Sequence, residues 1–244
     1  MKISRLLFLG ALFGTAPASR AQEAHSQKFV PLSQRPLLQI PPPSPYEKEI
    51  LAFEAADKKK FPAPGGVLFI GSSSIRLWRS LDTDFPGFNP INRGFGGSQI
   101  SDSVEFAPRI ATIYAPSKII FYAGTNDIQA GKSAPQVFED WRKFVAAVRP
   151  RLPATPITFL SIVESPSREK NVATVRAANA LIKSWNATQP NLDFIDVSTP
   201  LRGADGQMRL ELFQSDRLHL TAAGYAIWRE VLLPYLMPPS TPKS

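Results

Sequence analysis

The sequence contains no cysteine among its 244 residues, and only two residues are histidine. Without cysteine there can be no disulfide framework, no thiolate nucleophile and no zinc–thiolate site, so stability must come from the hydrophobic core. His25 lies in a proline-rich N-terminal stretch, so His219 is the one imidazole available to the rest of the chain. One histidine leaves only weak oxygen ligands such as Asp127 and Asp216, and we therefore expect neither a metal nor a cofactor.

After the short apolar run at residues 6–13, no hydrophobic run of the sequence approaches the ~20 residues of a membrane-spanning helix. The formal net charge is +8, but the only tight basic run, residues 58–60, ends a stretch that also carries Glu47, Glu49, Glu54 and Asp57. This mixture of charges indicates a solvated helix face rather than a nucleic-acid stripe. We therefore expect no nucleic-acid partner and no stable membrane insertion.

The N-terminus has the layout of a secretory signal peptide. Lys2 and Arg5 precede an apolar run at residues 6–13, and small residues then lead to Ala21. The pattern predicts a signal peptide at residues 1–21 and a secreted or periplasmic mature protein. An uncleaved membrane anchor is the alternative.

The remaining chain divides into a tether and one domain. Residues 22–45 are polar and then rich in proline, which predicts an extended tether with little core of its own. Residues 46–240 then form a single domain, because a chain with 43% hydrophobic residues at this length can bury one sizeable core. Ser44 is expected to cap the first helix and Thr221 the last.

Strand and helix patterns alternate along this domain. An unbroken apolar run predicts a buried strand at residues 67–70, and segments rich in apolar residues predict further strands near 91 and at 118–122, 156–163 and 192–197. Apolar residues at helical spacing predict helices at residues 46–59, 74–78, 98–114, 133–148, 168–188 and 221–236. The alternation predicts an α/β fold, a three-layer α/β/α sandwich with a central parallel sheet of about five strands.

Polar segments follow the strands at the edge where ligands bind in such a sheet. The first strand ends on Gly71 and three serines, so a hydroxyl would lie at a strand-to-helix corner with free backbone N–H groups around it. A serine run after a strand can also be an ordinary turn with an N-cap. A glycine cluster at residues 94–97 follows the second strand, and residues 124–127 (GTND) follow the third.

The fourth polar segment lies just before the last helix and contains the histidine. Asp216 precedes His219 by three residues, so its carboxylate can reach the ring and fix its tautomer. That is the orienting role that a nucleophile–base pair requires. A single histidine at a helix start is more often structural, so this spacing alone is weak.

Four segments together are far more specific than any one of them. FIGSSSI, NRGFGG, GTND and SDRLHL occur in this order and resemble the four signature blocks of the SGNH or GDSL hydrolases, a superfamily of esterases and lipases. The resemblance runs over about residues 46–237 and implies the flavodoxin-like fold of the SGNH hydrolases. By position it implies a catalytic triad of Ser73, Asp216 and His219 and an oxyanion hole formed by Ser73, Gly97 and Asn126.

One position departs from the pattern of that superfamily. Its usual Gly-Asp-Ser is here Gly71-Ser72-Ser73, which leaves the implied triad and oxyanion hole intact and changes only the local packing of the loop. No G-x-S-x-G elbow is present, which argues against the α/β-hydrolase fold.

The leading interpretation is an exported serine esterase that acts on a small-molecule or carbohydrate ester. It would remove a small acyl group, with acetyl on a carbohydrate as one candidate, through an acyl-enzyme intermediate. A lipase or lysophospholipase with a longer acyl chain is the first alternative, and it would need an apolar channel. A non-catalytic envelope or carbohydrate-binding module on the same fold is the second.

Overall fold

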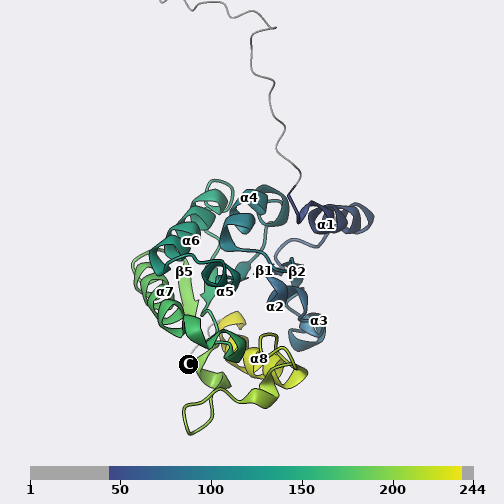
Figure 1. The fold of residues 1–244 in the computed structure, drawn as a ribbon. Helices are drawn as coiled ribbons and strands as arrows, with labels where there is room; N and C mark the ends of the chain where they lie inside the picture. The colour runs from purple at the N-terminus through teal and green to yellow at the C-terminus, as the bar shows by residue number, and fades with distance from the viewer. Residues whose placement is uncertain (1–43, 238–244) are drawn as a thin grey trace, which may run out of the picture. The chain divides into compact units, whose positions relative to one another are not determined.

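The computed structural model describes residues 44–237. The expected signal peptide and residues 22–43 of the expected tether lie outside the described residues. Within residues 44–237, a five-stranded sheet is covered by helices on both faces (Figure 1). No helix in this range combines the length and the apolar character needed to cross a membrane.

The sheet is parallel throughout, with the strand order β2-β1-β3-β4-β5. Its strands are β1 (Val67–Gly71), β2 (Ile91–Gly94), β3 (Lys118–Tyr122), β4 (Ile157–Leu160) and β5 (Leu192–Ile195). The chain moves outward from β1 to β2 and then returns to β3 on the other side of β1, so the strand order reverses between β1 and β3. Ligands bind at such a reversal in flavodoxin-like sheets. The order confirms the predicted α/β/α sandwich.

Helices and short 3-10 turns connect the strands. The α-helices are α1 (Glu47–Lys59), α2 (Ser73–Arg76), α3 (Leu81–Asp84), α4 (Ile100–Ile110), α5 (Thr125–Gln129), α6 (Ala134–Val148), α7 (Val172–Asn186) and α8 (Ala222–Leu236). The 3-10 turns are η2 (Pro166–Asn171), η3 (Thr199–Leu201) and η4 (Leu210–Leu212).

The central strand supplies side chains to two separate cores. Leu68 and Ile70 of β1 pack in the core that also contains residues of α1, α4, α6 and α7. Val67 and Phe69 pack in the other core, with residues of α2, α3 and α8. Figure 1 shows α4, α6 and α7 on one side of the sheet and α3 and α8 on the other. Because both faces are covered, the strand is apolar without alternation.

The two helix caps expected from the sequence have different outcomes. Thr221 caps α8, and its hydroxyl oxygen accepts a 3.3 Å hydrogen bond from the Gly224 N–H. The Ser44 prediction is wrong, because α1 begins at Glu47 and Tyr46 occupies the N-cap position. Ser44 Oγ instead accepts a 3.4 Å bond from the Tyr46 N–H.

Short helices occupy two segments for which the sequence predicted no helix. The segment after Trp78 contains α3, and the GTND segment begins α5. The helix predicted at residues 168–188 starts as the 3-10 turn η2, whose residue Arg168 has the non-helical angles φ −124° and ψ 32°. Regular α7 follows only from Val172. The structure therefore contains more short helical segments between its strands than the sequence predicted.

Candidate active site

The turn after β1 contains three serines, and only one of them is partly exposed to solvent. Gly71 has a φ of 148°, and a Cβ at this position would lie 1.9 Å from Tyr122 O, so the turn requires glycine. Ser72 is buried, and its N–H donates a 3.0 Å hydrogen bond to Tyr122 O. Ser74 is also buried, whereas Ser73, the first residue of α2, is partly exposed. The turn therefore offers Ser73 at the carboxyl edge of the sheet.

The loop before α8 brings the imidazole to this serine. His219 Nε2 lies 2.8 Å from Ser73 Oγ, and His219 Nδ1 lies 2.6 Å from Asp216 Oδ2. When Nδ1–H donates to the carboxylate, Nε2 is left without a proton and can accept one from the serine hydroxyl. The structure thus joins the three residues that the sequence predicts as a triad in one chain of hydrogen bonds.

Asp216 is held by the backbone of its own loop as well as by the ring. Its Oδ1 accepts hydrogen bonds from the N–H groups of Leu218 at 2.9 Å and His219 at 3.0 Å. Arg217 has a φ of 53°, a left-handed conformation within this loop. Burial acts to raise the pKa of Asp216, but the hydrogen bonds from His219 and Leu218 outweigh it and lower the pKa to about 2. The carboxylate is therefore ionised at any pH near neutral.

The glycine cluster after β2 ends in a left-handed turn. Gly97 has a φ of 80°, and a Cβ added there would meet nothing within 4 Å, so the backbone at Gly97 faces open space. The N-terminal part of α1 contacts this turn. Tyr46 donates its hydroxyl proton to Gly97 O at 3.2 Å, and Glu49 Oε1 accepts from the Gly96 N–H at 3.4 Å. Neither contact could be read from the sequence, because 51 residues separate Tyr46 from Gly97.

Asn126 lies next to the same turn with its side-chain amide held on both sides. Its Nδ2 donates to Ser98 O at 3.0 Å, and its Oδ1 accepts from Arg168 Nη2 at 3.0 Å. The amide nitrogen carries two protons, and one of them is used by Ser98. Among residues 44–237 no hydrogen bond uses the other, so Asn126 retains one donor beside Gly97.

Asp127 has a structural setting that the sequence does not reveal. It is fully buried, and each of its two carboxylate oxygens lies 3.1 Å from the Ile100 N–H, while Lys132 Nζ donates at 2.9 Å. Burial raises the pKa of Asp127 against the opposing effect of these hydrogen bonds. The carboxylate ties α5 to the start of α4 and so keeps Asn126 against the glycine turn. Within residues 44–237 no group of three or more His, Cys, Asp or Glu residues could hold a metal ion.

A groove of about 640 Å³ includes part of the loop that carries the histidine. Its charged lining residues are Glu164, Glu169, Arg176, Arg202 and Arg217, and apolar contributions come from Pro166, Val172, Met208 and Leu210. Glu164 forms ion pairs with both Arg176 and Arg202. The groove adjoins the histidine loop through Arg217, and none of Ser73, Gly97, Asn126, Asp216 and His219 lines it.

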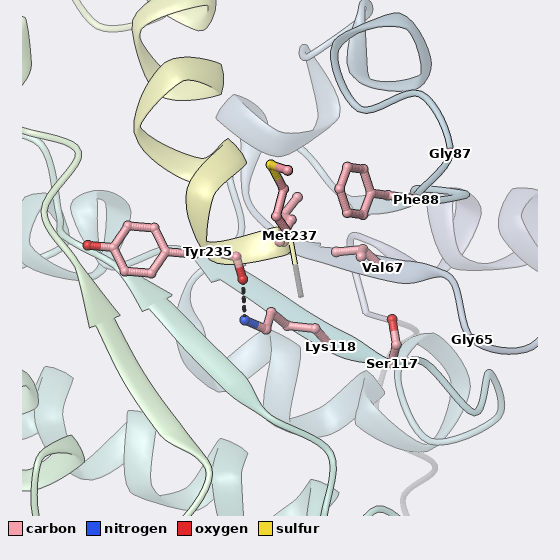
Figure 2. A pocket seen from close by; sticks show the side chains of 9 residues that line it. Gly65, Val67, Gly87, Phe88, Ser117, Lys118, Tyr235 and Met237 are labelled. Carbon is pink, nitrogen blue, oxygen red and sulfur yellow. Dashed lines mark hydrogen bonds between the residues drawn. The ribbon is translucent and has the colours of Figure 1, made fainter. Parts of the chain in front are cut away.

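A second cavity, of about 280 Å³, lies at the opposite edge of the sheet. Val67 and Lys118, the first residues of β1 and β3, line it together with residues near the end of α8 (Figure 2). Lys118 Nζ donates a 2.7 Å hydrogen bond to Tyr235 O across this cavity. Because Ser73 lies at the carboxyl end of β1, this cavity is not part of the candidate active site.

Comparison with known proteins finds a family match that includes the residues of the candidate site. Residues 71–227 match the GDSL-like lipase/acylhydrolase family. The chain belongs to this family. The GDSL-like match includes Ser73, Gly97, Asn126, Asp216 and His219, and the family supports a hydrolase of ester bonds. A search of curated proteins found no match.

Solved structures share the fold of this GDSL-like chain. A Streptococcus pneumonia protein whose given name relates it to platelet activating factor is 25% identical, with a TM-score of 0.69 over 78% of this chain and 92% of its own. A GDSL-like lipase from Bacteroides thetaiotaomicron is 20% identical, with a TM-score of 0.61 over 78% and 95%. A carbohydrate esterase family 3 protein from Talaromyces cellulolyticus is 18% identical, with a TM-score of 0.56 over 70% and 96%. These likenesses confirm the SGNH hydrolase fold.

Proposed function

We propose that the protein is an exported serine esterase that hydrolyses carboxylic esters with Ser73 as its nucleophile. One observation carries the proposal: a continuous chain of hydrogen bonds runs from Ser73 Oγ through the His219 ring to Asp216, with lengths of 2.8 and 2.6 Å. A non-catalytic module would have no use for a serine, a base and an ionised carboxylate in this order.

The reaction proceeds in two halves. His219 Nε2 takes the hydroxyl proton as Ser73 Oγ attacks the ester carbonyl, and the ionised Asp216 stabilises the imidazolium that forms. The C–O bond to the alcohol then breaks, and the imidazolium returns its proton to the leaving oxygen. A water molecule, deprotonated by the same ring, attacks the acyl-enzyme, releases the carboxylic acid and restores the Ser73 hydroxyl.

Negative charge on the carbonyl oxygen is stabilised by fixed donors. The proposed donors are the N–H groups of Ser73 and Gly97 and the second amide proton of Asn126. Such donors are worth about 3 kcal/mol each in other enzymes. The open space at Gly97 and the fixed amide of Asn126 favour this assignment.

The proposed substrate carries a small acyl group, with acetyl on a carbohydrate as the leading candidate. The charged groove that adjoins the histidine loop through Arg217 would suit a polar alcohol. Structural likeness to a carbohydrate esterase and to an acetylxylan esterase from Geobacillus stearothermophilus supports the same choice. A lipase remains the second candidate, because one similar structure is a GDSL-like lipase.

Hydrolysis of a p-nitrophenyl ester series from acetyl to palmitoyl, beside acetylated sugars, tests this proposal. We expect the highest kcat/KM for acetyl esters. Ser73→Ala should abolish hydrolysis, whereas the neighbouring controls Ser72→Ala and Ser74→Ala should retain most of it, since both side chains are buried. Activity that survives in Ser73→Ala would move the nucleophile elsewhere, and a preference for palmitoyl would favour the lipase.

Export is proposed from the N-terminal pattern alone. Cleavage after Ala21 would give a mature chain that starts at Gln22, with its formal net charge lowered from +8 to +5 by the loss of Lys2, Arg5 and Arg20. Mass spectrometry of the protein from the native host should find Gln22 at the N-terminus. Retention of Met1 would replace secretion by anchoring.

A further inference from the structure

We propose that Arg168 is a positioning residue that orients the Asn126 side chain in the proposed oxyanion hole, an inference that rests on the proposed function. Arg168 lies in η2, and its Nη2 donates to Asn126 Oδ1 at 3.0 Å. The two residues are 42 positions apart, so only the fold brings them together.

The orientation of the Asn126 amide depends on its two partners. The carbonyl and NH2 groups of an amide have nearly the same shape, so packing alone selects poorly between the two orientations. Arg168 offers only donors, and Ser98 O is only an acceptor. A single orientation satisfies both, and it turns the NH2 group toward the Gly97–Ser98 turn. Without Arg168 the carbonyl oxygen could occupy the place of the donor.

The surroundings of Arg168 do not fit a residue that serves only stability. Among residues 44–237 the guanidinium forms no ion pair, its only side-chain partner is the uncharged amide, and its Nη1 is buried without a hydrogen bond. A buried donor without a partner is unfavourable for folding. Burial lowers the pKa of Arg168, yet an arginine stays protonated at any pH near neutral.

An unneutralised cation at this position does favour catalysis. Its hydrogen bond to Oδ1 polarises the Asn126 amide and strengthens the remaining N–H as a donor. This effect acts through Asn126 and grows as negative charge develops on the carbonyl oxygen in the transition state, so it raises kcat rather than lowers KM.

The backbone of η2 is anchored to the other half of the site. The Ser167 N–H donates to Arg217 O at 3.1 Å, and within the turn itself the Arg168 N–H donates to Ser165 O at 2.9 Å. Arg217 lies in the loop between Asp216 and His219. One short segment therefore contacts the triad loop through its backbone and Asn126 through its side chain.

Kinetics of three variants on p-nitrophenyl acetate test the role. Arg168→Met should lower kcat by roughly 10- to 100-fold with little change in KM, because a displaced catalytic group costs up to about that factor. Arg168→Lys keeps the charge and one donor and should recover part of the loss. Lys170→Met, an exposed cation of the same segment, is the control and should match the wild type. An unchanged kcat in Arg168→Met, or a change confined to KM, would overturn the proposal.

A double-mutant cycle and a melting curve separate positioning from other roles. Asn126→Ala should lower kcat by about 10²- to 10³-fold, and adding Arg168→Met should lower it no further. Losses that multiply would show that Arg168 acts independently of Asn126. Because Nη1 is buried and unpartnered, Arg168→Met should melt no lower than the wild type. A lower melting temperature with unchanged kcat would make Arg168 merely structural.

These outcomes are distinguishable from failure of the proposed function. If Ser73→Ala keeps its activity, the esterase mechanism is wrong whatever Arg168 does. If the wild type is active and Ser73 is essential, but the Arg168 variants match Lys170→Met, only the positioning role is wrong.

Discussion

Replacement of Asp216 by asparagine should reverse the proton arrangement on the His219 ring. In the wild type, Asp216 Oδ1 accepts two backbone N–H groups and Oδ2 faces His219 Nδ1. Asparagine has one acceptor oxygen and one donor nitrogen. If the oxygen keeps the two backbone bonds, the NH2 group faces Nδ1, and the ring then carries its proton on Nε2, where it cannot accept one from Ser73.

The structure allows an estimate of the loss. The flipped side chain, which would preserve the correct tautomer, gives up two backbone hydrogen bonds of about 1 kcal/mol each. A difference of about 2 kcal/mol leaves roughly 3% of molecules with the correct tautomer. Loss of the negative charge beside the imidazolium adds to this, and the corresponding change in other Ser-His-Asp enzymes lowers kcat by about 10⁴. We therefore expect kcat to fall between about 10²- and 10⁴-fold.

The assay is steady-state hydrolysis of p-nitrophenyl acetate, with melting curves to establish that each variant is folded. Asp205→Asn is the matched control, because Asp205 Oδ1 accepts from the Gln207 N–H in a similar local turn away from the histidine. It should leave kcat unchanged. An Asp216→Asn variant within a factor of about 3 of the wild type would refute the reasoning, since a difference of 2 kcal/mol predicts a larger loss.

Three further predictions concern two substitutions and the pH profile of the wild type. Tyr46→Phe removes the hydroxyl that donates to Gly97 O and should lower kcat by about 5-fold, which corresponds to one hydrogen bond of about 1 kcal/mol, as steady-state kinetics would show. The plot of kcat/KM against pH should rise along a single limb between about pH 4 and 9. The reason is that Asp216, with its pKa lowered to about 2, stays ionised over this whole range. A second acid limb with its midpoint above about pH 4 would contradict this prediction. Asp57→Ala leaves the buried Arg93 guanidinium without its ion-pair partner and should lower the free energy of unfolding by about 3–5 kcal/mol, measured in urea.

The pH dependence of stability follows from the same lowered pKa. Because the pKa of Asp216 is lower in the folded protein than the ordinary value near 3.9, its contribution to stability is fully present above that value. It is lost as the pH falls through about 2. The Asp216 carboxylate is partly exposed, so solvent screening keeps this contribution small.

Local patterns in the sequence predicted the sheet and singled out Asp216 and His219, whereas Ser73 was chosen among the serines by the resemblance to the SGNH or GDSL hydrolases. Uninterrupted apolar runs such as residues 119–122 predict strands directly, because both faces of a parallel sheet are buried. His219 and Asp216 were found because the folded domain has no other histidine and the aspartate lies three residues away. Both signals are local, and the structure brings the predicted residues together with Ser73.

Contacts between distant segments could not be predicted in this way. The glycine turn is contacted by Tyr46 and Glu49 at the start of α1, which lie far from it along the chain. Asn126 is contacted by Arg168 of η2, which lies 42 positions away in sequence. No periodicity or motif marks such residues, because each is defined only by its partner in the fold. The helix predicted to begin at residue 168 does not begin there. Its first residues form the kinked 3-10 turn η2, in which Arg168 contacts Asn126.

Covalent labelling with a fluorophosphonate, followed by peptide mass spectrometry, tests the central claim most directly. An activated serine reacts with this probe without any need to know the natural ester. We predict a single adduct on Ser73, no adduct in Ser73→Ala, and strongly slowed labelling in His219→Ala, because the proposed mechanism requires the ring that lies 2.8 Å from Ser73 Oγ to accept its proton. An adduct on another serine, or a folded protein that does not react, would contradict the account.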